Sequence, residues 1–161
     1  MQITEITPTI AQLAVTLAGF SAVIVALRPK PIRQWASLDR LNFRILIQVA
    51  AVTTLFSLFP FGALAILEPP LAWKISLLVY GVYHLADVAS FAFNFPPDVR
   101  RVNRIATGIG FVIAALQIGF GLLGTEATMQ LMYLVALVWH LGISCLGFAL
   151  LIYSDGDTDA A

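Results

Sequence analysis

Five long apolar stretches, separated by short polar segments, account for nearly all of this chain. They cover residues 6–27, 41–67, 71–95, 105–123 and 129–153 of the 161-residue sequence. A helix that crosses the hydrocarbon core of a bilayer needs about 20 consecutive, mainly apolar residues. The pattern therefore predicts an all-α protein, a single polytopic transmembrane bundle with short loops over residues 1–153. Residues 154–161 are acidic and are expected to form a short disordered tail.

Composition supports the membrane assignment and excludes several functions. Hydrophobic residues make up 60% of the chain and charged residues 11%, whereas an ordinary soluble domain has about 45–50% and about 25%. Basic residues lie only beside the apolar stretches or in their loops, so nucleic-acid binding is not expected. The sequence has no hydrolase, zinc-protease, CxxC or phosphate-loop motif, and we expect no catalytic residue and no metal site. Cys145 lies in an apolar stretch and is expected to be a buried packing residue.

The third stretch, residues 71–95, carries a line of polar side chains on one helical face. The members of this line follow one another at spacings of three and four residues: Ser76, Tyr80, Tyr83, Asp87, Ser90 and Asn94. His84 lies beside the line. His140, in the fifth stretch, falls at a similar depth when a rise of about 1.5 Å per residue is assumed. Ionisable groups at such a depth indicate a functional site by default.

Asp87 is the main candidate for chemistry, because a charged carboxylate near the bilayer centre costs about 2.5–3.5 kcal/mol on insertion scales. It should therefore face protein or water, and either hold a proton or pair with His84, His140 or Arg44. One interpretation is a proton or ion channel or transporter, with a path along the third and fifth helices. The path would include further polar residues: Tyr80, Tyr83, Asn94, Gln48 and Gln117. The alternative is an accessory or scaffold subunit, in which these groups only hold helices together.

The two histidines suggest a further, minor alternative, in which both imidazoles ligate one b-type haem in an electron-transfer subunit. His84 and His140 lie on different helices, and Gly81 and Gly142 near them would leave space for the macrocycle. No pattern of supporting residues accompanies the pair. We therefore expect no cofactor under either of the two main interpretations.

Two helices carry seams of small residues, which allow helix backbones to approach closely in a membrane. In the first stretch an alanine recurs every four residues, at Ala14, Ala18, Ala22 and Ala26. In the fourth stretch the seam consists of Gly110, Ala114, Gln117, Gly121 and Gly124. Alanine is common in apolar helices, so a chance repeat is the alternative for the first seam. Because the two seams exceed what one small bundle needs, we expect a homo-oligomer or a subunit of a larger membrane complex.

Two stretches leave their course through the bilayer open. Pro60 removes a backbone hydrogen bond in the second stretch and should kink or end that helix. Such a kink would either act as a gate or only shape the packing. The fourth stretch is short and rich in glycine, so it either crosses fully or re-enters the same side.

The basic loops predict the orientation. Eight of the nine Lys and Arg residues lie in or beside the loops 28–40 and 96–104, and Lys74 is the exception. Cytoplasmic loops carry an excess of Lys and Arg, so both loops should face the cytoplasm and the N-terminus should lie outside. No basic region precedes the first apolar run, and we expect that helix to be retained rather than cleaved as a signal peptide.

The segment AQLAVTLAGFSAVIVALRP, followed by WASLDRLNFRILIQ, resembles a broad group of small bacterial inner-membrane proteins to which no activity is assigned. In that group an AGF-type first span precedes a basic loop, and the second span opens with an acidic-basic-Leu pattern. The resemblance covers about the first third of the chain. It implies a multi-pass protein of the bacterial inner membrane, and it implies no functional residue.

Overall fold

The computed structural model describes residues 3–97 and 99–154. Over these residues the protein is all-helical, and five helices are long and apolar enough to cross a membrane, which confirms the predicted fold class. The long helices are α1 (Ile3–Leu27), α2 (Ser37–Leu64), α3 (Pro69–Phe93), α4 (Arg101–Leu123) and α5 (Glu126–Ser154), and the 3₁₀ helix η1 (Ile32–Gln34) lies in the first loop. Except for Ser154, the tail predicted at 154–161 lies outside the described residues.

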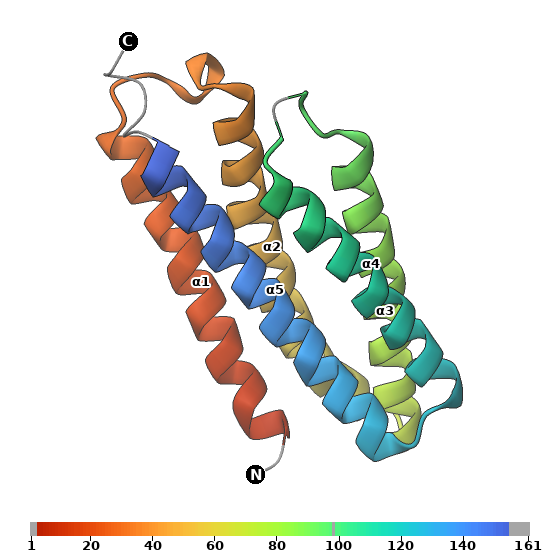
Figure 1. Cartoon of the computed structure of the whole chain (residues 1–161). Helices are drawn as coiled ribbons and strands as arrows, with labels where there is room; N and C mark the ends of the chain where they lie inside the picture. The colour runs from red at the N-terminus through yellow and green to blue at the C-terminus, as the bar shows by residue number, and fades with distance from the viewer. Residues whose placement is uncertain (1–2, 98, 155–161) are drawn as a thin grey trace.

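Successive long helices run in opposite directions and form one antiparallel bundle (Figure 1). α5 lies at the centre, because it packs against all four other long helices. α1 packs on α2 and α5 at one side, and α3 and α4 form a closely packed pair at the other side. Each spanning segment is helical, so its backbone polar groups are satisfied without water.

The two stretches of uncertain course both form long helices. α4 is continuous over 23 residues, or about 35 Å at 1.5 Å per residue. It lies antiparallel to α3 (Figure 1), so the re-entrant alternative does not fit. α2 continues past the buried Pro60 to Leu64, so of the two expected effects, a kink or an end of the helix, the second does not occur. Helices in a bundle tolerate an internal proline because neighbouring groups and local adjustment re-satisfy the freed carbonyl.

The alanine seam of α1 winds around its helix instead of following one contact face. Ala14 is fully buried and Ala18 is half-buried. Ala22 and Ala26, one and two turns further on, are exposed. A step of four residues exceeds one turn of 3.6 residues, so the seam rotates away from α2 and α5. The buried positions of α1 are Thr7, Ile10, Ala11, Ala14 and Ser21, which mix steps of three and four.

The small-residue seam of α4 faces α3. A Cβ atom built on Gly110 would lie 2.7 Å from Val88 Cγ1, and one on Gly121 would lie 2.6 Å from Leu78 Cδ2. Ala114 between them is fully buried. The same close approach occurs from the α3 side, where a Cβ atom on Gly81 would lie 2.9 Å from Gln117 Cβ. Only small residues permit this separation of the two backbones.

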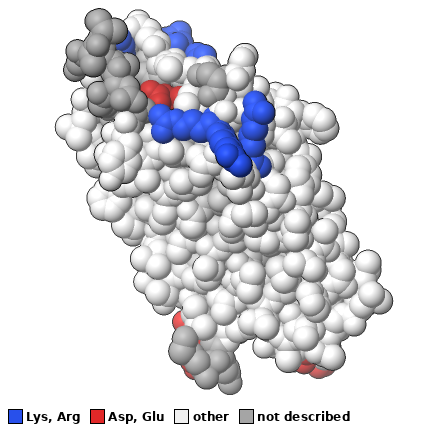
Figure 2. Space-filling view, in the orientation of Figure 1, with Lys and Arg blue, Asp and Glu red and all other residues white. Residues whose placement is uncertain are grey.

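Both basic loops lie at the same end of the bundle, as the charge pattern predicts. On the face shown in Figure 2, Lys and Arg gather near that end and the middle of the molecule shows none. Arg28 fastens this end: its Nη1 lies 3.0 Å from Asp39 Oδ2, and its guanidinium lies 4.3 Å from the centre of the Trp35 ring. Its Nη2 also donates to the carbonyl of Leu151, at 2.9 Å. One side chain thus joins the ends of α1, α2 and α5.

Candidate functional site

A buried polar cluster lies where α2, α3, α4 and α5 meet. At its centre the rings of His84 and His140 have centroids 4.2 Å apart. The matched depth that the sequence predicts for the two histidines is therefore confirmed. Their exposed fractions are 1% and 2%, so both imidazoles are shielded from the membrane and from water outside the bundle.

Each imidazole has a partner from a further helix. His84 Nδ1 lies 2.6 Å from Gln117 Oε1, which can only accept, so this nitrogen carries hydrogen and donates. His140 Nδ1 lies 2.9 Å from the Tyr80 hydroxyl and 3.0 Å from the carbonyl oxygen of Ala136. The Tyr80 hydroxyl in turn lies 3.3 Å from that same carbonyl. Both rings are therefore held in position by hydrogen bonds to groups on three helices.

Asp87 connects the cluster to the basic end of the bundle. It is 7% exposed, so it faces protein as expected, and its Oδ1 accepts a hydrogen bond from Gln48 Nε2. Arg44 Nε donates to Gln48 Oε1 at 3.0 Å, and Arg44 Nη2 donates to Ser90 Oγ at 3.3 Å. Arg44, one of the three possible cationic partners of Asp87, is therefore linked to the carboxyl group through the side-chain amide of Gln48. The chain of polar groups runs from an exposed guanidinium to a buried carboxyl group.

A cavity of about 50 Å³ is lined by residues that include Asp87 and the two histidines. Its polar lining consists of Asn42, His84, Asp87, Asn103, Thr107 and His140. A water molecule needs about 10–15 Å³ on this measure and two to four polar partners. The cavity can therefore hold a few water molecules between the carboxyl group and the imidazoles.

Two lining residues, Asn42 and Asn103, were not predicted as part of the site. They are 0% and 4% exposed, and Asn103 Nδ2 donates to Asn42 Oδ1 at 3.2 Å. Asn42 Nδ2 and Asn103 Oδ1 are buried without a partner among the described residues. In the sequence each asparagine stands one or two positions from an arginine at the start of an apolar stretch. That position is typical of residues at the membrane interface. The sequence therefore offers no indication that these two side chains are buried inside the bundle.

Some predicted residues lie at the edge of the cluster or outside it. Tyr83 lies at the edge of the cluster: it is 37% exposed, its side chain forms a hydrogen bond with Gln48, and its ring lies 5.5 Å from that of Phe56. Asn94 is exposed and donates to the carbonyl of Ser90, at the end of α3. Cys145 is exposed, so the expectation of a buried packing residue is wrong. Asn94 and Cys145 occupy the periphery of the bundle because their helical faces turn away from the four-helix junction.

An aromatic cluster fills the bundle on the other side of Tyr80, toward the end opposite the basic loops. The rings of Phe56 and Tyr80 stack with centroids 4.3 Å apart, and the Tyr133 ring lies 5.3 Å from that of Tyr80. Trp73 packs edge-on against Tyr133, whose hydroxyl donates to the carbonyl of Phe56 at 2.6 Å. The polar half of the bundle and the aromatic half therefore meet at Tyr80.

The geometry does not fit a haem between His84 and His140. Two imidazole–metal bonds of about 2 Å each would already span about 4 Å, before the rings themselves are counted. The ring centroids are only 4.2 Å apart, which leaves no layer for a macrocycle. The space beside Gly81 is occupied by residues of α4, and the space beside Gly142 is open but lies outside the cluster. Among the described residues, no three His, Cys, Asp or Glu side chains form a group that could hold a metal ion.

Fold and site together define a small multi-pass α-helical membrane protein with a buried polar cluster. No protein-family model matches the chain, and comparison with curated proteins and with solved structures finds no match. Its function is therefore argued from the geometry of the cluster.

Proposed function

We propose that this protein is a small proton channel or proton transporter, with its path through the polar cluster. The observation that carries the proposal is that Asp87, His84 and His140, all buried, line one cavity. Chains of carboxyl and imidazole groups inside membranes are characteristic of proton relays. Water in the cavity would complete a hydrogen-bonded route between them.

Protons are favoured over metal ions by the lining. A hard cation such as Ca²⁺ takes six to eight oxygen ligands. The described lining offers one carboxyl group, two amides and one hydroxyl, and most of its remaining side chains are apolar. A proton needs only a continuous series of donors and acceptors.

His140 is suited to pass a proton because both of its neutral forms have partners. With hydrogen on Nε2, Nδ1 accepts from the Tyr80 hydroxyl at 2.9 Å. With hydrogen on Nδ1, that nitrogen donates to the Ala136 carbonyl at 3.0 Å. The Tyr80 hydroxyl can rotate toward the same carbonyl, 3.3 Å away. Exchange between the two forms costs no hydrogen bond at Nδ1.

Access in this proposal is from the basic end, through Arg44, Gln48 and Asp87. We place that end in the cytoplasm, which the positive-inside rule supports. We place the protein in a bacterial inner membrane, which the resemblance of its first third supports. Passage to the opposite side requires the aromatic rings around Tyr80 to move. The described arrangement thus corresponds to a state that is closed on that side.

The test is proton flux into proteoliposomes under an imposed potential, followed with an enclosed pH dye. We expect Asp87→Asn to lower the flux by about 10²-fold or more, because removal of a proton-transfer group typically has an effect of this size. The matched control is Glu68→Gln, which changes an exposed carboxyl group in the turn between α2 and α3. A folded wild-type protein without flux, or equal flux in Asp87→Asn, would refute the proposal.

A specific observation supports a second candidate, an accessory or scaffold subunit. The hydrogen bonds of the cluster join different helices: Gln48–Asp87, His84–Gln117, Asn42–Asn103 and Tyr80–His140. Such bonds stabilise a membrane bundle by about 0.6 kcal/mol each on average. In this case Asp87→Asn would lower the midpoint of thermal unfolding or alter co-purifying subunits, and the wild type would conduct no protons.

A further inference from the structure

An apolar groove runs between α4 and α5 on the outer surface of the bundle, where lipid would lie. Its volume is about 550 Å³, and it extends from Val102 to Ile113 along α4 and from Val135 to Leu146 along α5. Gly142 lies in the groove, and a Cβ atom added there would meet nothing within 4 Å. All the residues that line the groove are apolar or glycine, so its surface suits a hydrocarbon chain.

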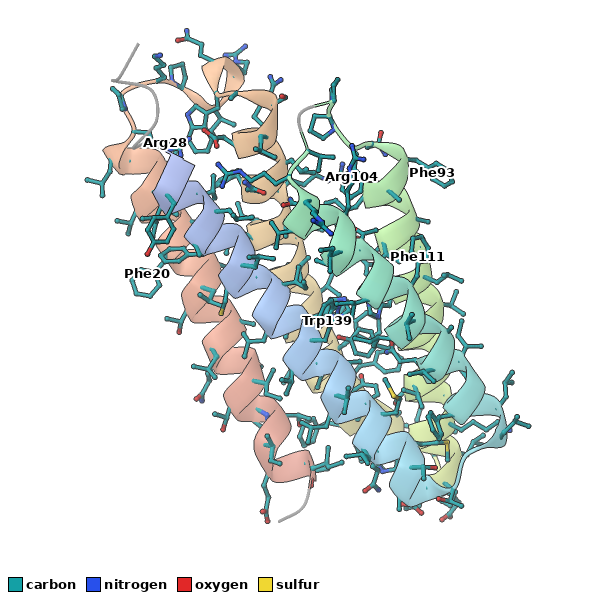
Figure 3. All side chains as sticks on the ribbon, viewed as in Figure 1. Phe20, Arg28, Phe93, Arg104, Phe111 and Trp139 are labelled. Atoms are coloured by element: carbon teal, nitrogen blue, oxygen red, sulfur yellow. The ribbon has the colours of Figure 1, made fainter. Side chains whose placement is uncertain are left out.

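The groove and the polar cavity share a wall. Ala106, Trp139, Ile143 and Leu146 line both spaces, so one layer of side chains separates the cavity from the bilayer. Trp139 is half-buried and lies between α5 and α4 in Figure 3. It is the largest of the four side chains that form the shared wall.

Two residues that line the cavity have polar atoms without a hydrogen-bond partner in the part of the chain that the structure describes. Asn42 Nδ2 is a donor and Asn103 Oδ1 is an acceptor, and both are buried without a partner among the described residues. An unsatisfied buried polar group costs about 1–3 kcal/mol, so a ligand that bonds to it gains affinity. One hydroxyl group can accept from the first atom and donate to the second.

Size and charge restrict the head of such a ligand. The cavity of about 50 Å³ is smaller than the cavity of about 150 Å³ that accommodates benzene, so it excludes an aromatic ring. The described lining includes the acidic Asp87 and no Lys or Arg, which disfavours phosphate or carboxylate. A small uncharged head therefore fits best.

We propose that groove and cavity form one site for a long-chain aliphatic alcohol, entered from the bilayer between α4 and α5. The hydrocarbon chain lies in the groove along Ile109, Val138 and Gly142. The hydroxyl group crosses the shared wall and binds the free atoms of Asn42 and Asn103. This site uses the same cavity as the proposed proton path. Its test measures labelling and competition and no proton flux, so the two proposals can fail separately.

The test is photolabelling of the protein in phosphatidylcholine nanodiscs with a dodecanol that carries a diazirine in its chain. Peptide mass spectrometry should find the label concentrated on residues 105–113 and 135–146. Unlabelled 1-dodecanol should compete at least about tenfold better than dodecane or dodecyl phosphate. Label spread evenly over all lipid-facing helices, or equal competition by dodecane, would overturn the proposal.

Two variants separate the site from general contact with lipid. Gly142→Leu fills the groove and should reduce the labelling about tenfold. Gly108→Leu is the matched control, because Gly108 also has open space around it, lies on α4 and does not line the groove. Asn103→Leu should keep the labelling but remove the advantage of dodecanol over dodecane. Unchanged labelling in Gly142→Leu, or cross-linking of the groove to a second copy of the chain, would contradict the assignment.

Discussion

At the scale of single residues, Tyr80 has two separable roles. Its ring stacks on Phe56, and its hydroxyl contacts His140. The ring belongs to the aromatic half of the bundle and the hydroxyl to the polar half. A variant that keeps the ring and removes the hydroxyl can therefore test proton passage with little change in packing.

We expect Tyr80→Phe to reduce proton flux by about fivefold to tenfold, the kinetic equivalent of one lost hydrogen bond of about 1–1.4 kcal/mol. The fold should persist, because the Ala136 carbonyl still satisfies His140 Nδ1. The flux assay in proteoliposomes and the unfolding midpoint in detergent are both measured. Tyr133→Phe is the control, because it also loses a buried hydroxyl, which bonds to the Phe56 carbonyl away from the histidines. Equal flux loss in both variants would show that the hydroxyl of Tyr80 has no special part.

At the scale of helices, the α3–α4 pair depends on glycine. We expect Gly110→Ala to destabilise the bundle by about 1–3 kcal/mol, the usual cost of overpacking. The new Cβ atom would lie 2.7 Å from Val88 Cγ1, a branched side chain with little freedom to move aside. Gly108→Ala, on the open side of the same helix, should be neutral or stabilise the helix by up to about 1 kcal/mol. Unfolding in mixed detergent micelles distinguishes the two, and equal stability would contradict the close packing of α3 on α4.

The helices could be predicted from the sequence because length and hydropathy determine them locally. At most of the helix ends, the predicted and the observed boundaries differ by two to four residues, and at the others they differ by one residue or none. The face that each helix buries was harder to predict from the sequence, because it depends on the neighbouring helices. The α1 seam shows this, because Ala14 and Ala22 belong to the same alanine repeat, yet Ala14 is buried and Ala22 is exposed.

The candidate site was predictable only in part, for the same reason. Asp87 and the two histidines stood out because ionisable groups are costly in an apolar helix. Their partners Gln48 and Gln117 were also visible as isolated amides. The Asn42–Asn103 pair was not, because its contact joins α2 and α4 over 61 positions of sequence.

At the scale of the whole molecule, the exposed end of the alanine seam is the surface to test for self-association. We expect Ala22→Leu with Ala26→Leu to weaken the predicted homo-oligomer by about tenfold in dissociation constant, because larger side chains prevent close backbone approach. The monomer should fold normally, since both positions are exposed. Blue-native electrophoresis and cross-linking in nanodiscs measure the change. Ala86→Leu, at an exposed alanine of α3, is the control, and a wild type that is monomeric in both assays would contradict the prediction.

The position of the imidazole pair within the thickness of the membrane has an electrical consequence. His84 lies nine residues before the end of α3 at Phe93, or about 14 Å from the basic end of that helix. A charge that reaches it from that side crosses roughly half of a hydrocarbon core of about 30 Å. A potential of 100 mV would change its free energy there by about 1 kcal/mol, half of the full value of about 2.3 kcal/mol. Proton occupancy of the cavity would therefore change about fivefold with membrane voltage, without any movement of a helix.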